Sequence, residues 1–221
     1  MDEEIRHIDL GFVNAYLVKA GDGFILIDTG MAPQFARLEA QLLQAGCLPD
    51  HLKLVVITHG DMDHTGGVAA LQAKYHARIA IHPADLAMAT TGAVVKRQGR
   101  GLLNKIAVTL MNLVGGRATA RAFQADILLQ DGQGLEAYDL AAKVIHTPGH
   151  TQGSIAVVTE QGNLFAGDTL ANRTRVDVAP FIQDYQVLRR SLERLKSLNA
   201  KMVYPGHGKP FPFEAIRSVN V

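Results

Sequence analysis

The stretch Thr58-His59-Gly60-Asp61-Met62-Asp63-His64-Thr65-Gly66-Gly67 decides both the fold and the chemistry of this 221-residue chain. It directly follows residues 54–57, a continuous apolar run that is typical of a strand covered on both faces. Two imidazoles and two carboxylates fall within six positions of the stretch. Divalent metals bind these side chains, and a tight loop lets several of them converge. The segment predicts a metal site at a strand end, against the alternative of a solvated loop with incidental histidines.

Three further residues, His150, Asp168 and His207, repeat this pattern, because each follows an apolar strand-like run and lies beside a glycine. Taken singly, each is an ordinary turn residue. Taken together, in this order and with these flanks, they resemble the metallo-β-lactamase fold family of metal-dependent hydrolases. The resemblance begins at Asn14-Ala15-Tyr16-Leu17 and leaves out only residues 86–125.

The resemblance implies an α/β (α+β) fold: a four-layered αββα sandwich of two mixed β-sheets flanked by helices, in a single domain over residues 1–221. It implies two divalent ions held in loops at one sheet edge. The implied ligands are His59, Asp61 and His150 for the first ion, Asp63, His64 and His207 for the second, and Asp168 as a bridge. Asp28, in Asp28-Thr29-Gly30, resembles the family's carboxylate that orients a ligand. An ordinary turn or helix-capping role is the alternative for Asp28.

Asp61 departs from the family pattern, which is His-x-His-x-Asp-His, because it stands at the second histidine. A carboxylate oxygen binds zinc at about the distance that imidazole does, so coordination is kept. The formal charge of the site falls by one. An added hard oxygen ligand also favours manganese or iron relative to a histidine-rich site, and the oxygen-reducing di-iron branch of the family has a carboxylate here. We expect zinc, with iron or manganese left open.

The implied activity is hydrolysis of a small-molecule ester, thioester or lactone by a metal-bridging hydroxide, which Asp63 would orient as the catalytic residue. The chain has no Gly-x-Ser-x-Gly motif that would supply a serine nucleophile. Thr169 and Tyr204 flank the ligands and are candidate substrate contacts, with ordinary packing as the alternative. Three other functions stay open: an iron-dependent redox protein, a phosphodiesterase or nuclease, and a non-catalytic binding module.

The charge of the chain is balanced overall, with 22 Lys and Arg against 21 Asp and Glu, which argues against a nucleic-acid partner bound by bulk positive charge. Residues 86–125 nevertheless carry six cations and no acidic residue. Leu and Ile recur there at helical spacing, so we expect a helical insertion. Arg97 and Arg100 in this insertion are candidates for drawing an anionic substrate toward the metals. A solvated helix face, plain core packing and a homodimer contact are the alternatives.

Location is predicted from what the sequence lacks. Cys47 is the single cysteine, so an internal disulfide framework is excluded. No apolar run approaches the ~18 residues of a membrane span, and the acidic amino terminus differs from a secretory signal. We expect a cytoplasmic protein that does not span a membrane.

Overall fold

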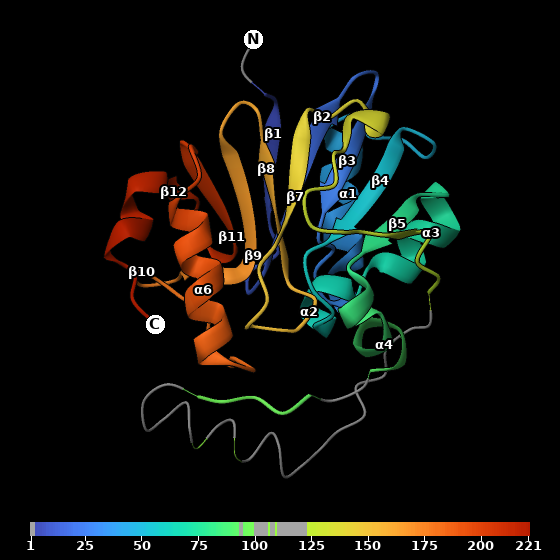
Figure 1. Cartoon of the computed structure of the whole chain (residues 1–221). Coiled ribbons are helices and arrows are strands. Elements are labelled where there is room, and N and C mark those ends of the chain that lie inside the picture. The colour runs from blue at the N-terminus through green and yellow to red at the C-terminus, as the bar shows by residue number, and fades with distance from the viewer. Residues whose placement is uncertain (1–2, 93–94, 100–105, 107–108, 110–122) are drawn as a thin grey trace.

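The computed structural model describes residues 3–92, 95–99, 106, 109 and 123–221. Two mixed sheets stack face to face at the centre of this part of the chain (Figure 1). The first sheet has the strand order β1(Ile5–Asp9), β2(Asn14–Ala20), β3(Gly23–Ile27), β4(Leu52–Ile57), β5(Arg78–Ile81), β6(Ile127–Leu128). The second has the order β12(Phe211–Pro212), β11(Met202–Gly208), β9(Asn163–Asn172), β8(Ile155–Thr159), β7(Ala142–His146), and β10(Val176–Asp177) pairs with β9.

Helices cover the outer faces of both sheets (Figure 1). The α-helices are α1(Phe35–Gln44), α2(Met62–Thr65), α3(Val68–Tyr75), α4(Pro83–Thr91) and α6(Tyr185–Lys196), and the 3-10 helices are η1(Ala32–Gln34), η2(Glu136–Tyr138) and η3(Phe213–Ser218). Side chains of α1 and α3 pack with the first sheet, and those of α6 and η3 pack with the second. The predicted four-layered sandwich is confirmed.

Side chains that alternate between the two faces of each strand form three apolar layers, which lie between the four layers of helices and sheets. In β4, Val55 and Ile57 join the layer beneath α1 and α3, whereas Leu54 and Val56 join the layer between the sheets. A strand covered on both faces has no polar side chains facing water, which explains the continuous apolar run before the stretch that begins at Thr58. The hydrophobic effect therefore fixes the depth and direction of β4, and with them the position of the loop that follows.

Two ligand-bearing segments differ from the expectation of short strands followed by loops. Asp168 lies within β9 and His207 within β11, and these two strands pair in parallel over this region. The pairing is irregular, with register shifts on both sides of Pro205, and Gly167 has a φ of +49°. The proline and glycines thus produce bulges within continuing strands instead of ending them.

The predicted helical insertion is only partly correct. Helix α4 begins at Pro83, before the predicted start at residue 86, and ends at Thr91, where Gly92 caps it with a φ of 66°. Residues 95–99, which we call the strap, are not helical. Gln98 exchanges two backbone hydrogen bonds with Ile182, of 2.6 and 3.0 Å. Of the predicted apolar stripe over residues 102–114, Ile106 is described and half exposed, and the rest lies outside the described residues.

In the described ranges, no helix has the length and apolar character that a membrane-spanning helix needs.

Candidate metal centre

All the ligands that the resemblance implies lie together at one end of the two sheets. They come from the loop after β4 and from α2, from the loop between β7 and β8, and from β9 and β11: His59, Asp61, Asp63, His64, His150, Asp168 and His207. Because β4 is parallel to its neighbour β3 and β9 is parallel to β11, these chain segments deliver side chains to the same edge. Sequence positions separated by almost 150 residues thereby form one cluster.

The first group is His59, Asp61 and His150, whose ligand atoms lie within 4.8 Å of one another. Asp61 Oδ2 is 2.9 Å from His150 Nε2 and 3.3 Å from His59 Nε2. The rings of the two histidines meet edge to face, with centroids 4.7 Å apart. One carboxylate oxygen and two imidazole nitrogens therefore face a common point.

The second group is Asp63, His64 and His207, and Asp168 lies between the two groups. Asp63 Oδ2 is 3.4 Å from His207 Nε2 and 3.9 Å from His64 Nε2. Asp168 Oδ1 is 3.4 Å from His64 Nε2, and its Oδ2 is 3.1 Å from His207 Nε2 and 3.7 Å from His150 Nε2. The Asp168 carboxylate thus reaches members of both groups.

The cluster fits divalent cations. Within the described part of the chain, three of its buried atoms, His59 Nε2, His64 Nε2 and Asp168 Oδ1, have no hydrogen-bond partner. A buried polar atom without a partner is costly, and here three such atoms converge with other nitrogen and oxygen donors. Gly206 lets β11 pass close by, because a Cβ at that position would lie 2.2 Å from Asp168 Oδ1. The donors are those that zinc, iron and manganese accept.

In the cluster, carboxylates and imidazoles lie next to each other and shift each other's pKa. Burial alone would raise the pKa of the Asp168 carboxyl, but the charges of His207 and His64 hold it well below its usual range. Burial likewise opposes charge on His64, yet the carboxylates of Asp28, Asp168 and Asp63 raise its pKa well above the usual value. The negative charge that a bound cation requires comes from the carboxylates.

Asp28 contacts the side of the His64 ring that faces away from the cluster. Its carboxylate accepts hydrogen bonds from Thr58 N (2.8 Å) and Thr58 Oγ1 (2.7 Å), and Oδ2 is 2.8 Å from His64 Nδ1. With Nδ1 engaged, the Nε2 atom of His64 is the one that faces the cluster. Asp28 adopts a φ of +59°, a backbone conformation that costs energy for a residue with a Cβ. An orienting role for Asp28 stays a prediction, which these contacts favour.

Asp85 is a buried residue of the site that the sequence did not reveal. It lies in the first turn of α4, and its carboxylate accepts hydrogen bonds from Gly60 N (2.8 Å), Thr151 Oγ1 (2.6 Å) and Gly153 N (2.7 Å). It therefore ties the loop carrying His59 to the loop carrying His150. An aspartate in a first helical turn is common for helix stability alone, so the sequence holds no signal for this role.

Arg97 is not available to attract a substrate, which corrects the expectation from its charge. Its side chain is only 4% exposed, and Nη2 donates to Asp61 Oδ1 at 2.5 Å. Nη1 donates to the carbonyl oxygens of His150 (2.6 Å) and Phe181 (3.1 Å). Arg100 lies outside the described residues.

Comparison with known proteins identifies the family. The model of the metallo-beta-lactamase superfamily matches residues 8–207. The chain belongs to this superfamily. It is accordingly a metal-binding, metal-dependent hydrolase.

Relatives of this superfamily member span most of its length. Human (Homo sapiens) acyl-coenzyme A thioesterase MBLAC2 is 28% identical over 219 residues, which cover 92% of this chain and 75% of the human protein. Among solved structures, TTHA1623 in a di-iron-bound form has a TM-score of 0.68 at 28% identity, covering 94% of this chain and 93% of its own. BLEG-1 B3 metallo-beta-lactamase has a TM-score of 0.75 at 22% identity, covering 96% and 95%. The last likeness shows the shared fold.

The two other candidate substrate contacts of this superfamily member are engaged elsewhere. Thr169 is fully buried, and its hydroxyl donates to Thr147 Oγ1 at 3.0 Å. The Tyr204 hydroxyl donates to Asn163 Oδ1 at 3.3 Å, at the start of β9, and its ring stacks on Phe165. Both contacts are those of packing side chains, which is the alternative that the sequence left open.

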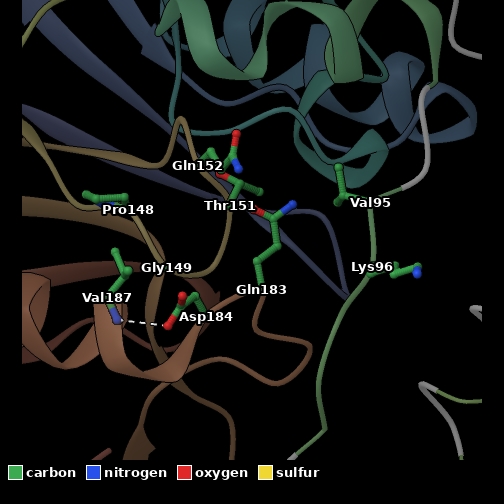
Figure 2. A pocket seen from close by; sticks show the side chains of 9 residues that line it. All are labelled: Val95, Lys96, Pro148, Gly149, Thr151, Gln152, Gln183, Asp184 and Val187. Atoms are coloured by element: carbon green, nitrogen blue, oxygen red, sulfur yellow. Dashed lines mark hydrogen bonds between the residues drawn. The ribbon is translucent and has the colours of Figure 1, made fainter.

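A pocket of ≈ 410 Å³ lies beside the loop that carries His150, because Gly149 and Thr151, the two chain neighbours of His150, line it (Figure 2). It is lined by the strap, the loop around His150 and the start of α6: Val95, Lys96, Pro148, Gly149, Thr151, Gln152, Gln183, Asp184 and Val187. In Figure 2, Gln183 extends between the strap and the loop toward Thr151, whereas the Lys96 side chain extends away from Pro148 and Val187. The volume suits part of a small molecule.

Proposed function

We propose that this chain hydrolyses thioesters of the acyl-coenzyme A class with two divalent cations. The proposal is carried by a cluster of two candidate ligand groups with Asp168 between them, in a chain similar over 92% of its length to an acyl-coenzyme A thioesterase. A pocket lined by Gly149 and Thr151, the chain neighbours of His150, supports it. The sequence also favours oxygen esters and lactones as substrates. The carbonyl carbon of a thioester is more electrophilic than that of an ordinary oxygen ester or lactone. Those compounds remain the nearest substrate alternatives.

The residues divide the work of such a hydrolysis. His59, Asp61 and His150 would hold one cation, Asp63, His64 and His207 the other, and Asp168 would touch both. The bound cations would acidify a water molecule and stabilise the negative charge that develops on the carbonyl oxygen. Asp63, with a 21% exposed side chain, would orient that water. His64 keeps its Nε2 toward the cluster because Asp28 engages its Nδ1.

The metal that we propose is zinc, and iron is the alternative that one of the comparisons supports. TTHA1623 has a solved structure in a di-iron-bound form at 28% identity. Asp61 adds a hard oxygen ligand, which iron accepts readily. Elemental analysis of protein purified without chelators or added metal distinguishes the two. Two zinc per chain are expected. Two iron atoms together with oxygen reduction, and no hydrolysis, would replace the hydrolase proposal with the redox alternative.

The proposed activity is tested with a substrate panel. Acetyl, medium-chain and long-chain acyl-coenzyme A thioesters are compared with oxygen esters, lactones and a phosphodiester, and released thiol is measured spectrophotometrically. We expect the highest kcat/KM on an acyl-coenzyme A thioester. Dialysis against a strong chelator should remove the activity, and added zinc should restore it. Turnover of the phosphodiester alone, or of no compound with two metals bound, would contradict the proposal.

The pocket gives a separate prediction about substrate binding. Val187→Phe is expected to raise KM for a long-chain acyl thioester about tenfold, because the ring would displace about two buried methylenes worth ~0.8 kcal/mol each. KM for the acetyl thioester should change little. Val187 lines the pocket, whereas Arg190, on the same helix, is exposed, so Arg190→Phe is the matched control. An equal change in both substrates would place the acyl chain elsewhere.

A further inference from the structure

We propose that Asp61 and Arg97 act as one unit at the first metal site, the group of His59, Asp61 and His150. In this unit Asp61 supplies a single ligand oxygen, and Arg97 holds the other oxygen and offsets the carboxylate charge. The inference rests on the proposed binding of a cation by this group. It concerns how the chain prepares the site, independently of which substrate is hydrolysed.

The two oxygens of Asp61 face different partners. Oδ2 points at the imidazoles, 2.9 Å from His150 Nε2 and 3.3 Å from His59 Nε2. Oδ1 accepts a hydrogen bond of 2.5 Å from Arg97 Nη2. A guanidinium that occupies Oδ1 leaves one oxygen for a cation, so the carboxylate would bind through one atom and not through both.

Arg97 is itself fixed, which is what a positioning residue requires. Its Nη1 donates to the carbonyl oxygens of His150 and Phe181, and the strap that carries it is bonded to Ile182 through the backbone of Gln98. The planar guanidinium therefore spans Asp61 and the His150 loop at once. A lysine ammonium, which is a point donor on a flexible stem, does not reproduce this fork.

Charge is the second reason to treat the pair as a unit. Arg97 Nη2 lies 2.5 Å from Asp61 Oδ1, and the Arg97 side chain is only 4% exposed. The guanidinium charge is thus held directly beside the carboxylate. The pair is neutral overall and offers one donor atom, as an unprotonated imidazole does. Asp61 and Arg97 together present to a cation what a histidine alone would present at position 61.

A double-variant cycle tests this equivalence. Metal-free Asp61→His, Arg97→Met and the double variant are titrated with zinc against a chromophoric chelator, and native mass spectrometry counts bound ions. In D61H the guanidinium faces an imidazole and a cation without its carboxylate, so first-site zinc affinity should fall at least tenfold. In the double variant the guanidinium is absent, and affinity should return to within about threefold of the wild type.

The controls separate this role from general structure. Lys96→Met removes a cation from the same strap, and its side chain extends away from Pro148 and Val187 (Figure 2); it should leave zinc binding unchanged. Zinc bound by Asp63, His64 and His207 reports that each variant is folded. If D61H does not fold, Asp61→Asn replaces it in the cycle. R97M should then recover only part of the lost affinity, because an amide oxygen binds zinc more weakly than a carboxylate or an imidazole.

Two results would overturn the proposal. One is a D61H variant that binds two zinc ions as tightly as the wild type while Arg97 is present. The other is additivity, in which the double variant loses as much affinity as the two single variants combined. Because the readout is zinc binding, either result leaves the thioesterase proposal standing, and absence of thioesterase activity leaves this inference intact.

Discussion

Replacement of Asp168 by asparagine is expected to lower kcat/KM for the proposed thioester at least ~10³-fold, which corresponds to ~4 kcal/mol of lost transition-state stabilisation. The carboxylate reaches His150 in the first group and both His64 and His207 in the second. A neutral amide of the same shape removes the negative charge that both cations would share. Steady-state kinetics, with zinc per chain from elemental analysis, measures the effect.

The control for Asp168→Asn is Glu160→Gln, which makes the same change of charge on an exposed side chain. It should leave the kinetics and the zinc content at wild-type values. Circular dichroism should show that both variants keep the fold. A D168N variant with two tightly bound zinc ions and unreduced kcat/KM would remove Asp168 from the metal centre, whatever the substrate.

The residues of the cluster could be predicted because each belongs to a short, local sequence pattern. The stretch around His59 places four metal-binding side chains after one buried strand, and His150, Asp168 and His207 each lie beside a glycine. The strand ends also follow from the sequence, since apolar runs covered on both faces leave little choice of position. The exception is the length of β9 and β11, where Pro205 and Gly167 suggested loops but produce bulges in continuing strands.

Arg97 shows why the rest could not be predicted. Its sequence neighbourhood is cationic and carries no acidic residue, which favours a solvated or substrate-facing role. Its carboxylate partner lies 36 positions earlier, at Asp61, and the backbone that fixes its strap lies beyond residue 180. Neither spacing is a local pattern. The contact depends on how α4 and the strap return over the metal-binding loops, which is a property of the folded chain.

Asp85 also contacts residues that are distant in the sequence, and its replacement has the largest expected effect on stability. Replacement of Asp85 by alanine leaves the buried N–H groups of Gly60 and Gly153 without their acceptor and removes a bond from Thr151. At about 1–3 kcal/mol for each orphaned group, unfolding free energy should fall by about 3–5 kcal/mol. The melting temperature of the metal-free protein should fall by about 10 °C, as measured by calorimetry.

The location of these bonds makes the loss more than a general destabilisation. Gly60 lies between the first-group ligands His59 and Asp61, and Thr151 follows His150, so the two loops lose the tie that sets their separation. Zinc affinity of the first group should therefore weaken as well, by 10- to 100-fold in line with other residues that support metal ligands.

Asp184→Ala is the matched control. That carboxylate also accepts two backbone N–H bonds, but at the exposed start of α6, so about 1 kcal/mol and unchanged zinc binding are expected. If D85A resembled D184A in both measurements, the loops would be held by their own packing, and Asp85 would be an ordinary first-turn aspartate.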